Sequence, residues 1–102
     1  MLLMTLNGDQ EMVLTAIFNL GKGDITTPVT IGAIHHAFSD MDVRDLVKHL
    51  LVLLDAGLIA NAGKTTEKIG NTFVITSKGI DYYNRNIGRP YPKEQTAGKN
   101  LP

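Results

Sequence analysis

The segment LLVLLDAGLIANAGK, residues 50–64, most constrains how this chain can fold, because a dense apolar run meets a glycine and then resumes. Apolar residues at helical spacing predict a helix over residues 43–56 with one buried face. Gly57 suits the end of that helix, because glycine adopts positive φ without steric cost. Leu58 and Ile59 then favour a short strand. The predicted stripe of the helix is Val43, Leu46, Val47, Leu50, Leu53 and Leu54, widened by Leu51.

A first helix is expected over residues 9–20. The segment NGD at residues 7–9 is a helix entry, and Gly21 follows the last apolar residue of the run, where a C-cap is expected. The apolar residues that recur at helical spacing are Met12, Val13, Ala16, Ile17 and Leu20. We therefore expect these five side chains to form the core-facing stripe.

A second, short helix is expected over residues 30–38, with Thr30 as its cap. Pro28 disfavours helix in the residue before it, so residues 25–29 are expected to be extended or irregular. The turn SDMD at residues 39–42 is rich in cap residues and separates this helix from the helix over residues 43–56. Three helices with a tight turn between the last two form a helix-turn-helix arrangement.

A β-hairpin and a last helix are expected after Gly57. Residues 61–71 (NAGKTTEKIGN) have the small and polar composition of a hairpin loop, and residues 72–76 form a β-branched and aromatic return strand. Ser77 begins a last helix that includes Ile80 and Tyr83. The tail at residues 88–102 has little apolar content and is expected to be disordered, which leaves residues 1–87 as one domain.

Two short motifs, LLDAGLI at residues 53–59 and FVITSKGIDYY at residues 73–83, resemble the winged-helix DNA-binding domains of bacterial and archaeal regulators. The matching positions are Leu53, Gly57, Leu58, Ile59, Ile75, Thr76 and Gly79. As an architecture, the resemblance covers about residues 9–84. It implies an α+β winged helix: a three-helix core, a wing made of a two-stranded antiparallel β-hairpin, and a C-terminal helix.

The resemblance implies a small protein that binds double-stranded DNA and regulates transcription. Its third helix would enter the major groove, and its wing would contact the backbone. Carried over to this sequence, the DNA-binding residues are Arg44, Lys48, His49, Lys64, Thr65 and Lys68. Arg44 and Lys48 are four residues apart and share a helix face, from which either can read a guanine edge or hold a phosphate. Lys64 and Lys68 would contact phosphates.

The charge pattern favours an alternative, a winged-helix protein-interaction module that binds no DNA. The net charge is zero, but residues 1–57 carry seven acids and three bases, whereas residues 58–102 carry three acids and seven bases. Any anionic partner should therefore meet mainly the C-terminal half. Three aspartates, Asp40, Asp42 and Asp45, lie at the start of the third helix, where they suit the helix dipole and oppose phosphates.

Other classes of function find little support in the sequence. His35 and His36 are adjacent on a helix and point about 100° apart, so they cannot chelate one ion together. There is no cysteine and no motif of a nucleophile or phosphate loop, so we expect neither an enzyme nor a cofactor or metal site. No apolar run reaches the roughly 18 residues of a membrane span, and a cytoplasmic protein is expected.

A homodimer is also expected. The apolar start of the chain at residues 1–6 and Val52, which falls off the main stripe, would form a surface buried by a second copy. The alternative is that the N-terminus packs on its own core.

Overall fold

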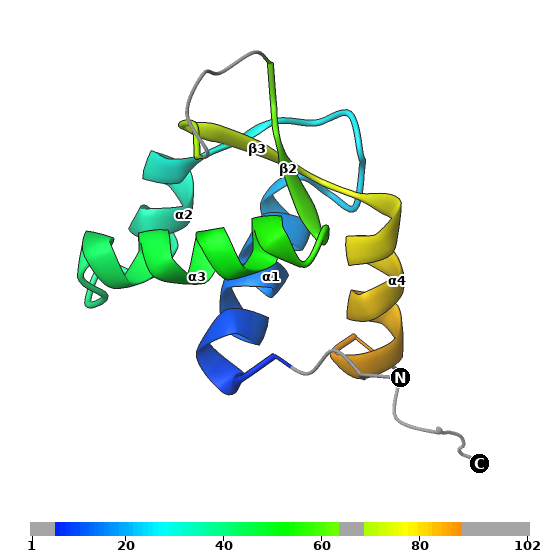
Figure 1. The fold of residues 1–102 in the computed structure, drawn as a ribbon, viewed down its shortest axis with the longest axis horizontal. Coiled ribbons are helices and arrows are strands. Elements are labelled where there is room, and N and C mark those ends of the chain that lie inside the picture. The colour runs from blue at the N-terminus through cyan, green and yellow to red at the C-terminus, as the bar shows by residue number, and fades with distance from the viewer. Residues whose placement is uncertain (1–5, 64–68, 89–102) are drawn as a thin grey trace.

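The computed structural model describes residues 6–63 and 69–88, which form four helices and three short strands (Figure 1). In chain order these are α1 (Gly8–Leu20), β1 (Val29–Thr30), α2 (Ile31–Ala37), α3 (Val43–Asp55), β2 (Ile59–Asn61), β3 (Thr72–Ile75) and α4 (Ser77–Asn86). In Figure 1, α3 crosses in front of α1, the strands lie above the two helices, and α4 stands beside α1. This is the predicted α+β winged helix, and the boundaries of α1, α2 and α3 and the start of α4 lie within one residue of their expected positions.

The sheet has one strand more than the predicted hairpin. β2 and β3 are antiparallel, with Ile59 opposite Ile75, as expected. β1 adds to the other edge of β3 and places Val29 opposite Phe73, so the strand order is β1-β3-β2. The prediction of a two-stranded wing was therefore incomplete. β1 has only two residues, too few to show the alternation by which a sequence reveals a strand.

The core lies where α1, α3 and the inner face of the sheet meet. Its fully buried side chains include Val13, Leu14, Ile17, Ile34, Leu46, Leu50, Leu53, Leu58, Ile59, Phe73 and Ile75. Both predicted core-facing stripes were wrong in part. In the stripe of α1, Met12 is 51% exposed and Leu20 43%, and in the stripe of α3, Val43 is 47% exposed. The buried face of α1 is centred on Leu14 and its neighbours, which rotates Met12 and Leu20 out of the core.

Polar side chains cap the helices at their N-termini. Asn7 and Gln10 form a capping box at α1, in which each side chain accepts a backbone N–H of the other residue. The Thr30 hydroxyl accepts the N–H of Ala33 at α2, as predicted. Each cap satisfies a backbone donor that has no partner inside its helix, which explains why the predicted starts agree with the observed ones.

Two aromatic contacts hold α4 against α1. The Tyr82 hydroxyl donates to a Glu11 carboxylate oxygen at 3.1 Å and accepts the N–H of Leu6 at 3.1 Å. Burial, together with the hydrogen bond to Glu11, raises the pKa of the Tyr82 phenol. One residue further on, the Tyr83 ring stacks on Phe18 with 3.9 Å between centroids. These contacts cover a second side of α1.

The turn after α3 is a Schellman motif, as the apolar run ending in glycine suggested. Gly57 has φ +77° and donates its N–H to the Leu54 carbonyl, while Leu58 donates to the Leu53 carbonyl, both at 3.0 Å. Leu58 and Ile59 then enter the core. The helix thus ends and the wing begins within one turn.

Thr76 and Gly79 lock this turn to the start of α4. The Thr76 hydroxyl donates to the Gly57 carbonyl at 2.7 Å and accepts the N–H of Gly79 at 3.0 Å, so it caps α4. The Thr76 N–H donates to the Leu58 carbonyl at 3.1 Å. A Cβ at Gly79 would collide with the Leu58 carbonyl oxygen. The two motifs that carry the resemblance therefore contact each other. We call this contact region, made of Gly57, Leu58, Thr76 and Gly79, the α3–α4 junction.

Residues 1–5, 64–68 and 89–102 lie outside the described residues. The expectations of a disordered tail and of an apolar N-terminal surface therefore remain predictions, apart from Leu6, which is buried in the core.

Substituting Gly79→Ala should destabilise the domain by about 2 to 3 kcal/mol, because the added methyl must displace the Leu58 backbone. This corresponds to a loss of about 10 °C or more in Tm for a domain of this size. Gly32→Ala in α2 is the matched control, since an added Cβ there meets only the Thr30 hydroxyl at 4.0 Å. It should stabilise by about 0.5 to 1 kcal/mol. Thermal unfolding that does not separate the two variants would contradict the role of the junction.

Candidate nucleic-acid interface

The face of α3 that points away from the core carries both predicted basic residues. Leu46, Leu50 and Leu53 face the core, and Arg44 and Lys48 lie on the exposed face one helical turn apart. The Arg44 side chain is 85% exposed. His49, the third predicted residue of this helix, is half-buried at the edge of the face. Two of the three predicted contacts on α3 are thus open to a ligand.

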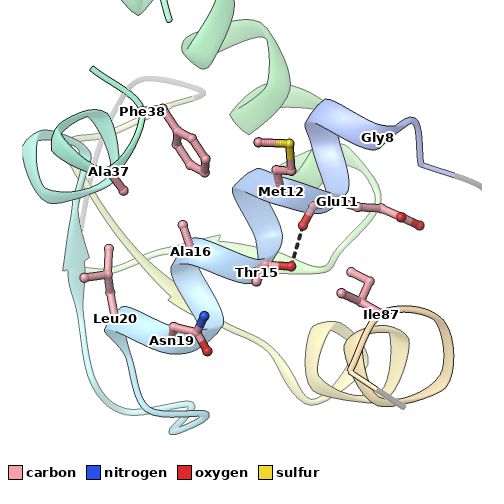
Figure 2. A pocket seen from close by; sticks show the side chains of 10 residues that line it. All are labelled: Gly8, Glu11, Met12, Thr15, Ala16, Asn19, Leu20, Ala37, Phe38 and Ile87. Atoms are coloured by element: carbon pink, nitrogen blue, oxygen red, sulfur yellow. Dashed lines mark hydrogen bonds between the residues drawn. The ribbon is translucent and has the colours of Figure 1, made fainter. Parts of the chain in front are cut away.

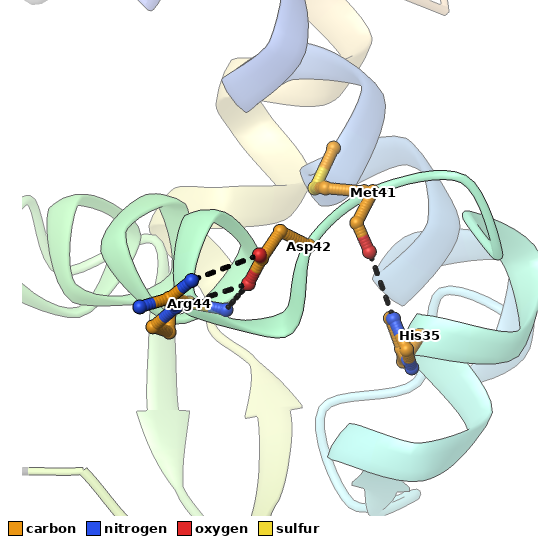
Figure 3. A network of polar contacts seen from close by, with 4 residues as sticks. All are labelled: His35, Met41, Asp42 and Arg44. Carbon is orange, nitrogen blue, oxygen red and sulfur yellow. Dashed lines mark hydrogen bonds and ion pairs between the residues drawn. The ribbon is translucent and has the colours of Figure 1, made fainter.

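Asp42 caps α3 and pairs with Arg44 (Figure 3). Its Oδ1 accepts the Arg44 N–H at 2.8 Å, and its Oδ2 lies 3.4 Å from an Arg44 guanidinium nitrogen. The hydrogen bonds from the Arg44 backbone and side chain lower the pKa of the Asp42 carboxyl. Because exposed ion pairs contribute little, Arg44 can leave Asp42 for another anion at small cost while the backbone cap stays in place.

His35 fixes the turn between α2 and α3. Its Nε2–H donates to the Met41 carbonyl at 2.9 Å, across the turn that leads into Asp42 (Figure 3). His36 is exposed, and within the described ranges no group of three or more His, Cys, Asp or Glu side chains could hold a metal ion. Sequence reasoning missed this role of His35, because the bond joins a helix end to an irregular turn and leaves no periodic pattern.

A shallow hollow between α1 and α3 brings acidic and basic side chains together. It encloses about 270 Å³ and is lined by Asp9, Met41, Asp45, Lys48 and His49. The exposed side of α3 alternates in sign over its cap and first half, where Asp42, Arg44, Asp45 and Lys48 follow one another at the surface. Over the described part of this interface, aspartates interrupt the positive charge.

The base of the wing begins directly at the end of α3. The Ala62 N–H donates to the Thr72 carbonyl at 2.8 Å, which extends the pairing of β2 and β3. Further out, the Asn61 side chain accepts the N–H of Gly70 at 2.8 Å. The predicted wing contacts Lys64, Thr65 and Lys68 follow this base and lie outside the described residues.

The fold is similar to that of a known winged-helix protein. The crystal structure of the reduced form of MarR from Escherichia coli matches with a TM-score of 0.60 and 21% sequence identity, over 95% of this chain and 67% of that chain. No protein-family model matches the sequence, and no curated protein matches it either. The likeness confirms that the chain has the winged-helix fold, to which its two motifs pointed.

None of the described helices is long and apolar enough to cross a membrane.

The lowered pKa of Asp42 predicts how its cap responds to acid. A depressed pKa means that the stabilisation by Asp42 is present above the unfolded-state pKa of about 3.9 and is lost as pH falls through the folded-state value. The melting temperature of Asp42→Asn should therefore lie below that of the wild type at neutral pH, and the difference between the two should vanish in acid. Asp40→Asn, in the same exposed turn but not at the cap, is the control. A gap that stays constant from pH 7 to about 2 would contradict this.

Proposed function

We propose that this chain is a small DNA-binding protein that regulates transcription as a homodimer in the cytoplasm. The observation that supports the proposal is the exposed face of α3, where Arg44 and Lys48 lie one turn apart in the first half of the helix. α3 would enter the major groove, and Lys64, Thr65 and Lys68 would meet the backbone. The similarity of the fold to that of MarR also supports it.

The proposed roles differ among the residues of α3. Arg44 would exchange its long contact with Asp42 for a bidentate contact to a guanine or a phosphate, at which guanidinium geometry is strongest. Lys48 would act as a point charge against phosphate, and His49 would contact the groove edge. The Asp42 carboxylate would remain the cap that holds the start of α3 in place.

The affinity for mixed duplex DNA should fall steeply with salt, because phosphate contacts release counterions. Lys48→Ala, Lys64→Ala and Lys68→Ala should each flatten the slope of log K against log salt by about 0.9. Lys78→Ala is the matched control, since Lys78 is exposed at the start of α4 and its side chain lies near Gly57, past the end of α3 that is distant from Arg44. Fluorescence anisotropy across several salt concentrations measures the slopes. Binding that salt does not move, or no binding at low salt, would rule out the proposal.

The second candidate is a winged-helix protein-interaction module, which the interruption of positive charge by Asp42 and Asp45 favours. In this case the acidic start of α3 would face a basic protein surface, because opposite charges attract across an interface. The same aspartates would repel the phosphates of DNA.

Asp45→Lys separates the two candidates, because Asp45 is exposed and does not cap α3. A DNA-binding α3 should gain affinity for duplex DNA and a salt slope steeper by about 0.9. An interaction module should instead lose affinity for the protein partner that purifies with the wild-type chain. Tighter DNA binding with an unchanged partner complex would reject the second candidate, and weaker partner binding without DNA binding would reject the first. Circular dichroism confirms that the variant is folded.

A further inference from the structure

An apolar groove runs along the outer side of α1 and faces solvent (Figure 2). It encloses about 510 Å³, with α1 as its floor and side chains from the ends of α2 and α4 as its walls. Met12, Ala16 and Leu20 form the floor, and Phe38 and Ile87 stand on either side. A second hollow of about 440 Å³ continues it past Phe38 to Met41.

The apolar surface of α1 is wider than the face that it buries in the core. One face, with Val13, Leu14 and Ile17, is fully buried in the core. The other, with Met12 and Leu20, is 51% and 43% exposed at these two residues. Contacts of Glu11 and Phe18 with α4 cover a further side. The apolar surface of α1 thus extends beyond its buried face to side chains that remain exposed, and an exposed apolar surface of this kind suits a partner.

The spacing of the outer residues indicates which partner fits. Met12, Ala16 and Leu20 lie four residues apart and form one ridge, with the smallest side chain at its centre. A two-fold axis at Ala16 would place each Met12 against Leu20 of the other copy and bring the two helices closest at the alanines. The ridge is therefore complementary to itself in an antiparallel arrangement.

Charge agrees with the same arrangement. Asp9 precedes Met12 by three residues at the N-terminal end of α1, where it also lines the hollow that α1 shares with Lys48 of α3. Lys22 is exposed just beyond the C-terminal end of α1. The axis at Ala16 would set Asp9 of each copy opposite Gly23 of the other, next to Lys22, and the two helix dipoles would run antiparallel, which is favourable.

We infer that the outer face of α1 is the interface at which two copies of this chain associate, antiparallel about Ala16. Each α1 lies in the groove of the other copy, between Phe38 and Ile87. The interface specifies the surface of the homodimer proposed above, but its argument does not use DNA binding, so either idea can fail without the other. It differs from the dimer surface expected from the sequence, because it uses Met12 and Leu20 instead of residues 1–6 and Val52.

Cysteine cross-linking tests the axis directly, because the chain has no cysteine of its own. At an interaxial distance of about 8 Å, two Cα atoms that face each other come within disulfide range. Ala16→Cys should therefore form a covalent dimer under mild oxidation. Met12→Cys and Leu20→Cys should cross-link poorly alone and efficiently when mixed. Ile25→Cys, exposed after the end of α1, is the control and should remain monomeric. Equal cross-linking at residues 16 and 25 would overturn the proposal.

Sedimentation over about a hundredfold range of protein concentration provides a second test. The wild type should rise from 11.1 kDa towards twice that mass. Leu20→Asp should stay monomeric, while Ile25→Asp, a matched change at a side chain that is 47% exposed, should associate like the wild type. A wild type that remains at 11.1 kDa throughout would overturn the inference, as would a Leu20→Asp variant that associates normally. If Leu20→Asp fails to fold, the cysteine experiment alone decides.

Discussion

The Thr76 hydroxyl bridges the end of α3 and the start of α4, and the placement of the wing depends on this contact. It donates to the Gly57 carbonyl and accepts the Gly79 N–H, while the Leu58 carbonyl accepts the Thr76 N–H. Leu58 and Gly79 are buried, and a buried backbone group without a partner is costly, so the bonds of Thr76 to these two residues and the absence of a side chain at Gly79 hold the two helix ends at one separation. β2 and β3 leave and return at this junction, which places the wing beside α3.

The sequence predicted the two halves of the junction, but not the contact between them, because the signal of each half is local. A glycine after an apolar run and a threonine three residues before a glycine each have a backbone reason that holds in any fold. The cap residues likewise gave correct helix starts, and the two motifs pointed to the winged helix that the likeness to MarR confirms. β1 was missed because two residues carry no periodicity, and their pairing with β3 depends on tertiary packing.

The sides of α1 show the limit of periodicity. Met12 and Leu20 have the same spacing as core residues, so a sequence pattern alone cannot tell a ridge that meets the core from one that meets a partner. The candidate site shows a similar limit. The exposure of Arg44 and Lys48 followed from the helix period, but the contacts of Arg44 with Asp42 and of His35 with Met41 depend on how the turn is folded.

The central claim is that the junction presents the outer face of α3, together with the wing, to a nucleic acid. Amide chemical shifts of the labelled chain, followed during titration with a mixed DNA duplex at low salt, test it most directly. The account predicts that the largest changes fall on Arg44, Lys48 and the hairpin between Asn61 and Thr72, with little change at the buried Val13 and Ile17. Changes confined to α4, or no change at all, would contradict it.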